Sequence, residues 1–177
     1  MKETIKFQPS INNGMYLHAS SVNINGGALL FLGHSSSGKS TISQLLSKKY
    51  QVIADDKVWI ERNKNGKWIV CEGEDFLFPG KPAASPHGRK KKYPLLAVLR
   101  IFKSNTSGIK SVIPLETCRY LMDAVFEIDI QRKQCDANTI KKWFSLAAEI
   151  SKKIQGWELT FKKDISIINL INGKFYK

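Results

Sequence analysis

Cysteine is scarce in this sequence of 177 residues, which contains only Cys71, Cys118 and Cys135. Three widely spaced cysteines without a paired pattern speak against a disulfide framework and against a structural zinc site. Long apolar runs are also missing, because no stretch approaches the roughly 18 residues that cross a bilayer. The N-terminal residues 1–6 lack the apolar core of a signal peptide. We therefore expect a reduced, cytoplasmic protein without a membrane span.

Acidic residues are few compared with basic ones. The 28 lysines and arginines outnumber the 15 aspartates and glutamates, which gives a net charge of +13. Such a surface attracts nucleic acid, an acidic peptide or a phosphorylated ligand, although a basic surface that is simply solvated explains the charge equally well. Hydrophobic residues make up 42% of the chain, enough for a substantial core. The length fits a single domain over residues 1–177.

The hydrophobic pattern predicts an alternation of strands and helices, and hence one α/β domain. Strands are expected at residues 1–13 (ragged), 16–24, 28–32, 51–54, 57–61, 67–71, 95–102, 109–113, 157–161 and 165–171. Helices are expected at residues 41–49, at 114–126, and from Asp136 or Asn138 to 154. A long loop is expected at residues 76–94, which hold four of the six prolines and the run Arg89-Lys90-Lys91-Lys92.

The strongest motif follows the apolar run Ala28-Leu29-Leu30-Phe31-Leu32. Residues 33–40 read Gly-His-Ser-Ser-Ser-Gly-Lys-Ser and match the P-loop pattern G-x-x-x-x-G-K-[ST]. Its glycines let backbone N–H groups wrap around phosphate oxygens, the lysine contacts the terminal phosphates, and the last serine offers a hydroxyl to Mg²⁺. The bland alternative is a serine-rich surface turn. The predicted ATP-binding set is Gly33, His34, Ser35, Ser36, Ser37, Gly38, Lys39, Ser40 and Thr41.

Two further features suggest chemistry beside that loop. Asp55 and Asp56 end the strand that follows the P-loop helix, where one carboxylate can hold Mg²⁺ with Ser40 and the other can accept a proton from an attacking hydroxyl. A turn that merely caps the strand is the alternative. His18 lies one hairpin before the P-loop strand, so antiparallel pairing can bring it near the phosphates to orient a catalytic carboxylate. A half-buried structural histidine is the alternative there.

Taken together, His18, the P-loop and Asp55-Asp56 resemble the catalytic domain of bacterial HPr kinase/phosphorylase and its relatives over roughly residues 14–100. That family has the phosphoenolpyruvate carboxykinase fold, so the resemblance implies a mixed β-sheet around the P-loop. It also implies phosphoryl transfer from ATP to a serine hydroxyl. Lys39 and Ser40 would then hold phosphate and metal, one of the two aspartates would be the base, and His18 would assist it.

Three departures separate this chain from ordinary HPr kinases. Ser36 stands where those enzymes usually have a glycine, Thr41 replaces an acidic residue, and the C-terminal segment that recognises HPr has no close copy. The more distant relatives include kinases of lasso-peptide precursors and kinases of free serine. Supporting candidates are Lys81 or Arg89 for phosphoryl charge and the acidic residues Glu72, Glu74 and Asp75 for a second metal, with ordinary solvated cations and a simple hairpin end as the alternatives. Trp59 or Trp68 can stack on adenine, but cross-strand packing is the safer assumption for both.

The sequence therefore predicts an ATP- and Mg²⁺-dependent kinase that phosphorylates a serine hydroxyl in a peptide or small protein, with an acidic substrate favoured by the basic loop. A kinase of a small molecule such as free serine is the first alternative. A nucleotide-binding regulator or nucleic-acid-associated ATPase is the second, disfavoured because no aromatic-basic RNA motif is present. HPr kinases assemble into oligomers, so the resemblance also implies a homo-oligomer.

Overall fold

Two long strands organise the β-structure in the computed structural model, which describes residues 13–71, 91–128 and 135–175. The first half of β1 (Gly14–Ile24) pairs with β4 (Lys57–Arg62), and its second half pairs with β2 (Gly27–Leu32) and β3 (Gln51–Ala54). The long strand β6 (Lys92–Lys103) pairs in turn with β5 (Trp68–Cys71), β2 and β8 (Gly156–Phe161). Because β4 also pairs with β5, strands β2, β1, β4, β5 and β6 form a closed hydrogen-bonded ring.

The sheet is mixed. Strand β2 runs parallel to β6, and β6 runs parallel to β8, whereas β7 (Gly108–Val112) is antiparallel to β8. All six residues of β2 are buried, as expected of a central strand with neighbours on both sides. Because β2, β6 and β8 run in the same direction, their carboxyl ends lie at the same edge of the sheet.

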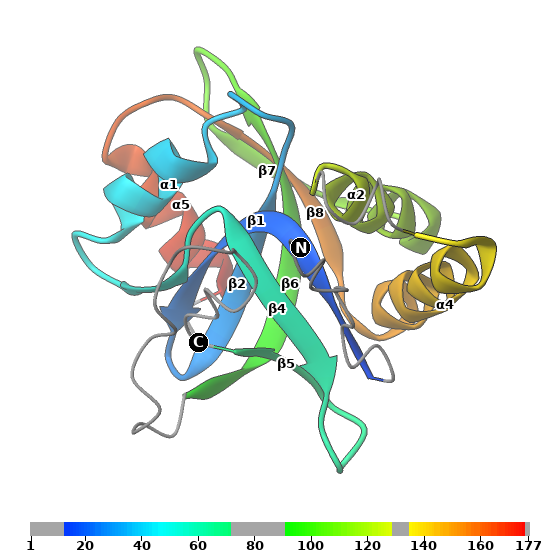
Figure 1. Ribbon diagram of the computed structural model, residues 1–177. Helices are drawn as coiled ribbons and strands as arrows, with labels where there is room; N and C mark the ends of the chain where they lie inside the picture. Colours follow the sequence, from blue (N-terminus) through cyan, green and yellow to red (C-terminus); the bar gives the residue numbers. More distant parts are fainter. Residues whose placement is uncertain (1–12, 72–90, 129–134, 176–177) are drawn as a thin grey trace, which may run out of the picture.

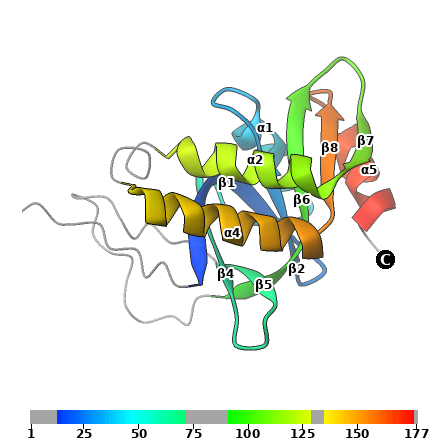
Figure 2. The same ribbon diagram turned by 90° about the vertical axis from the view of Figure 1, so that its right-hand side faces the viewer.

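In the part of the chain that the structure describes, four helices cover the two faces of the sheet (Figures 1 and 2). Helices α1 (Lys39–Leu46) and α5 (Ser166–Phe175) lie on one face, and α2 (Pro114–Phe126) and α4 (Ala137–Lys153) lie on the other. The α1/α5 side buries a core that includes Phe31, Leu99 and Phe161, and the α2/α4 side buries a second core that includes Leu30, Leu121 and Trp143. The predicted α/β class with a mixed sheet is confirmed.

Most predicted elements are present, and α2 has its predicted bounds. For α4, the structure decides between the two expected caps, because the Asp136 carboxylate accepts a hydrogen bond from the Thr139 N–H. The helix predicted from Thr41 begins earlier, at Lys39, inside the motif itself. The three cysteines form no disulfide.

The prediction of a strand at residues 165–171 was wrong, because this segment is the start of helix α5. Its β-branched isoleucines favour a strand, but the buried Ile167, Ile168 and Ile171 are spaced as on one helix face. The Asp164 carboxylate also accepts a hydrogen bond from the Ser166 N–H at the helix start.

The predicted loop at 76–94 is only partly testable, because residues 72–90 lie outside the described part of the chain. Its last residues, Lys92 to Pro94, belong to β6, so the strand begins before the expected Leu95. Pro94 lies opposite Ile69 of β5. The ragged strand expected at residues 1–13 falls almost entirely outside the described residues.

Candidate functional site

A loop at the carboxyl end of β2 connects this strand to α1, as the motif requires. Within it Ser36 has φ 65° and Gly38 has φ 105°, both in the left-handed region. Gly38 is the N-cap residue of α1, and no side chain caps the helix. The first N–H groups of α1 therefore have neither an intrahelical partner nor a side-chain acceptor, which makes this helix end attractive to an anion.

Both motif glycines lie too close to their surroundings to carry a side chain. A Cβ atom on Gly33 would lie 2.2 Å from Ser37 Oγ, and one on Gly38 would lie 2.9 Å from Phe161 Cζ and 3.2 Å from Lys103 Cε. The loop thus depends on glycine at these two positions for steric as well as conformational reasons.

Lys39 is the one lysine of the loop, and its side chain is buried, with 7% of its surface exposed. Its Nζ donates hydrogen bonds to the carbonyl oxygens of Gly33 (2.5 Å) and His34 (3.1 Å). Burial lowers the pKa of this ammonium, and the nearby carboxylates of Glu127 and Asp56 oppose that shift. The Glu127 carboxylate lies 4.0 Å from Lys39 Nζ, which is too long for a hydrogen bond. The buried ammonium can therefore bind a further anion at closer range.

The two aspartates lie in the tight connection between β3 and β4, and both are exposed. Asp56 has φ 73°, a conformation that aspartate tolerates better than most residues. His18, opposite Lys57 in the β1–β4 pair, places its Nε2 atom 3.2 Å from Asp56 Oδ1. The pairing of β1 with β4, rather than the expected pairing of β1 with the P-loop strand, therefore brings the histidine and the aspartate together.

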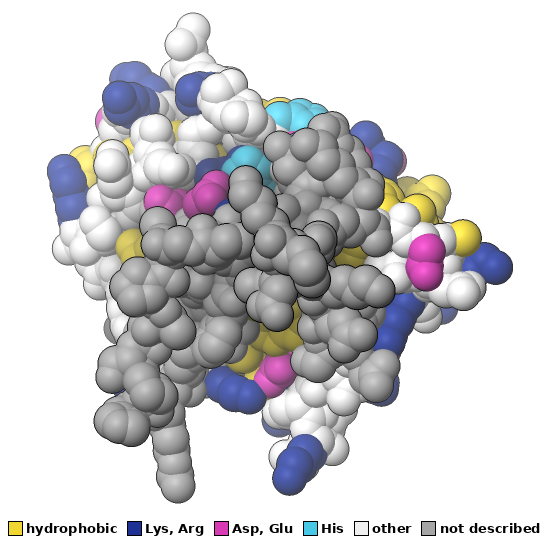
Figure 3. Space-filling view, viewed as in Figure 1, with side chains coloured by type: hydrophobic (Ala, Val, Ile, Leu, Met, Phe, Trp, Pro, Cys, Tyr) yellow, Lys and Arg dark blue, Asp and Glu magenta, His cyan; other side chains and the backbone are white. Residues whose placement is uncertain are grey.

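These residues surround one cavity of about 340 Å³. Its lining comprises His18, Ser35, Ser36, Gly38, Lys39, Ser40, Thr41, Asp55, Asp56 and Lys103. Three members of the predicted ATP-binding set, Gly33, His34 and Ser37, do not line it. Figure 3 shows histidine and acidic side chains gathered on one face, with basic side chains between and beside them.

Two residues at this site were missed by the sequence analysis. Lys103, at the end of β6, lines the cavity because β6 runs parallel to the strand that leads into the loop. Glu127, directly after α2, places Oε1 2.7 Å from His34 Nδ1 and Oε2 2.8 Å from His18 Nδ1, with Lys39 Nζ 4.0 Å away. Neither residue belongs to a motif, and no sequence signal marks them.

The tryptophans considered for adenine stacking lie away from the cavity. Trp59 is 9% exposed, packs against the ring of Tyr16 at 4.6 Å between centroids, and donates a hydrogen bond from Nε1 to Glu61. Trp68 is 3% exposed. Both tryptophans pack within the β-structure, which agrees with the alternative of cross-strand packing. The other supporting candidates, Lys81, Arg89, Glu72, Glu74 and Asp75, lie outside the described residues.

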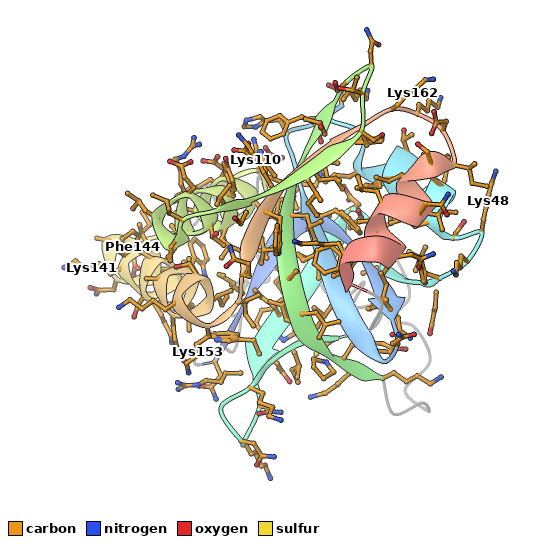
Figure 4. All side chains as sticks on the ribbon, turned by 180° about the vertical axis from the view of Figure 1, so that it is seen from behind. Lys48, Lys110, Lys141, Phe144, Lys153 and Lys162 are labelled. Carbon is orange, nitrogen blue, oxygen red and sulfur yellow. The ribbon has the colours of Figure 1, made fainter. Side chains whose placement is uncertain are left out.

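Basic side chains are spread over several elements on the opposite side of the molecule. Figure 4 shows Lys48, Lys110, Lys141, Lys153 and Lys162 projecting from the end of α1, from β7, from α4 and from the segment after β8. Three of them form ion pairs, namely Lys110 with Glu158, Lys153 with Glu149 and Lys162 with Asp164. The labelled lysines thus come from separate elements rather than from one helix or strand.

Within the described ranges, no helix is both long and apolar enough to cross a membrane. In the same part of the chain, no three histidine, cysteine, aspartate or glutamate side chains converge as a ready-made metal site.

No family model matches the sequence, and a search of curated proteins finds no match. Among solved structures, the fold is similar to that of the HPr(Ser) kinase/phosphatase from Coxiella burnetii, with a TM-score of 0.43 and 12% sequence identity. The match covers 90% of this chain and 92% of that chain.

Proposed function

We propose that this chain is a kinase that binds ATP with Mg²⁺ through a P-loop at residues 33–41 and phosphorylates a serine hydroxyl. The observation that carries the proposal is the convergence of the glycine-serine loop, the Asp55-Asp56 pair and His18 on one cavity. These elements are far apart in the sequence, and each has a defined part in phosphoryl transfer. The proposal places the chain among distant HPr kinase-like proteins with the phosphoenolpyruvate carboxykinase fold.

The residues present fit the phosphates of ATP. The uncapped start of α1 and the buried ammonium of Lys39 both favour a bound anion. Lys103, exposed at the cavity wall, adds a second cation that can neutralise phosphate charge.

The residues also fit Mg²⁺. This ion is usually held by one or two carboxylates together with substrate phosphates, so a complete protein cage is not needed. Ser40, Asp55 and Asp56 supply a hydroxyl and two exposed carboxylates at the same cavity. When bound, Mg²⁺ and ATP supply the activated phosphoryl group and neutralise charge on it.

The chain's own residues remove the proton from the acceptor hydroxyl. One of Asp55 and Asp56 takes the proton from the serine hydroxyl, and the contact between His18 and Asp56 favours Asp56 for this role. Asp55 is then left for the metal. The acceptor is a serine in a peptide or small protein, with free serine as the alternative.

The test is ATP-dependent phosphate incorporation into a panel of serine peptides with acidic or neutral flanks, and into free serine. We expect Lys39→Ala to weaken ATP binding, and Asp55→Asn/Asp56→Asn to lower transfer at least about 100-fold while ATP still binds. Glu116→Gln, which removes an exposed ion pair with Arg119 whose two members do not line the cavity, is the control and should behave as the wild type. Undiminished transfer by the aspartate double variant would show that the assignment of the base is wrong.

A further inference from the structure

Glu127 is held firmly in place by the helix that precedes it. Its N–H donates to the Asp123 carbonyl at the end of α2, and this helix buries Leu121, Ala124 and Val125 against the core. The carboxylate itself is 19% exposed. Because its backbone is anchored and its side chain is mostly enclosed, few other positions are open to it.

The two oxygens of this carboxylate contact two different histidines. Oε1 accepts a hydrogen bond from His34 Nδ1 in the loop, and the buried Oε2 lies 2.8 Å from His18 Nδ1 on β1, a charge contact that is not aligned as a hydrogen bond. A carboxylate accepts but cannot donate, so any ring nitrogen that faces one has to carry a proton for the contact to be favourable. On His18 this applies to both nitrogens, because Nε2 lies 3.2 Å from Asp56 Oδ1. The neutral ring has a single proton, and Glu127, which is closer to the ring and more enclosed than Asp56, favours this proton on Nδ1.

We infer that Glu127 is a positioning residue, which fixes the ring of His18 against Asp56 and ties the 33–41 loop to α2. The inference builds on the proposed function, in which Asp56 handles the acceptor proton. Glu127 does not line the cavity, so it acts through the histidines rather than on the substrate. A third group that orients a histidine in this way recurs in acid–base sites, where it sets the tautomer and the direction of the ring.

A direct readout is the tautomer of His18, measured by long-range ¹H–¹⁵N correlation spectra at a pH well above the usual imidazole pKa. The chain has three histidines, so His34→Asn and His87→Asn variants assign the signals. We expect a protonated Nδ1 on His18 in the wild type and its loss in Glu127→Ala, where the proton moves to Nε2. Glu127→Gln, which keeps an oxygen acceptor, should retain the wild-type tautomer in part. Glu116→Gln, on the same helix, should leave the signal unchanged.

A kinetic readout completes the test, with Mg²⁺·ATP alone as the substrate for basal hydrolysis. Glu127→Ala should lower kcat by roughly 10- to 100-fold, as loss of an orienting partner does at other sites, and should change KM for ATP by only about a few-fold. An unchanged His18 tautomer, or an unchanged kcat with wild-type turnover present, would overturn the inference. If the wild type neither binds nor hydrolyses ATP, the proposed function fails, and the spectra still decide whether Glu127 positions His18.

Discussion

Gly38 and Gly26 show how differently a glycine can matter at two positions of similar backbone conformation. Both have positive φ, 105° and 84°, but a Cβ atom on Gly26 would meet nothing within 4 Å, whereas one on Gly38 would press on Phe161 and Lys103. Gly26→Ala should therefore lose about 1 kcal/mol through backbone strain. Gly38→Ala should lose at least about 1 kcal/mol more, because overpacking adds to the strain.

The measurement is the free energy of unfolding in urea for both variants and the wild type. Equal losses for Gly38→Ala and Gly26→Ala would mean that the ring of Phe161 moves aside easily and that the loop is not sterically confined.

At the scale of elements, the attachment of α2 to the sheet determines the position of Glu127, which directly follows this helix. Tyr120 of α2 donates a hydrogen bond to Glu158 Oε1 on β8, and Lys110 of β7 pairs with Glu158 Oε2 at 2.7 Å. Burial, followed by the contact with Glu158, raises the pKa of Tyr120 to about 12. The cluster joins three elements that are distant in the sequence.

This raised pKa predicts a pH dependence on the alkaline side. Because the folded-state pKa of Tyr120 is higher than that of an unfolded tyrosine, about 10, the contribution of Tyr120 to stability is complete below pH about 10 and is lost as the pH rises towards about 12. Tyr120→Phe should cost about 1 kcal/mol at neutral pH through the lost hydrogen bond. The difference from the wild type should shrink across that alkaline window, as measured by denaturant unfolding at several pH values. A difference that grows there would contradict the prediction.

For the whole molecule, the proposed ligand is an anion that binds a chain with a net charge of +13. Mg²⁺·ATP should stabilise the folded state by about 2.7 kcal/mol at a concentration of 100 times Kd, because only the folded state binds it. At a fixed concentration of Mg²⁺·ATP, higher ionic strength should reduce this gain, since the exposed Lys103 and the net positive charge of the chain are screened by salt.

Thermal or urea unfolding with and without Mg²⁺·ATP measures the effect. Chelating Mg²⁺ should remove part of the stabilisation, and Lys39→Ala should remove most of it. Equal stabilisation of the wild type and Lys39→Ala would show that ATP binds elsewhere on the basic surface.

Much of the fold followed from local patterns. The apolar run at 28–32 became the fully buried β2, Pro114 marked the start of α2, and Asp136, one of the two expected caps, proved to be the cap of α4. The strand prediction for residues 165–171 was wrong because it followed the preference of isoleucine for strands. The helical spacing of the buried isoleucines outweighs this preference, since only one face of the segment packs on the core.

The sequence by itself determined the loop at 33–41 and the residue types that chemistry would need around it, because glycine, lysine and aspartate act through local geometry and charge. Only the tertiary structure decided which distant residues join them. The parallel pairing of β2 with β6 brings Lys103 to the cavity, and the packing of α2 on the sheet brings Glu127 between His18 and His34. Such contacts arise from strand order and helix packing, which no short stretch of sequence encodes.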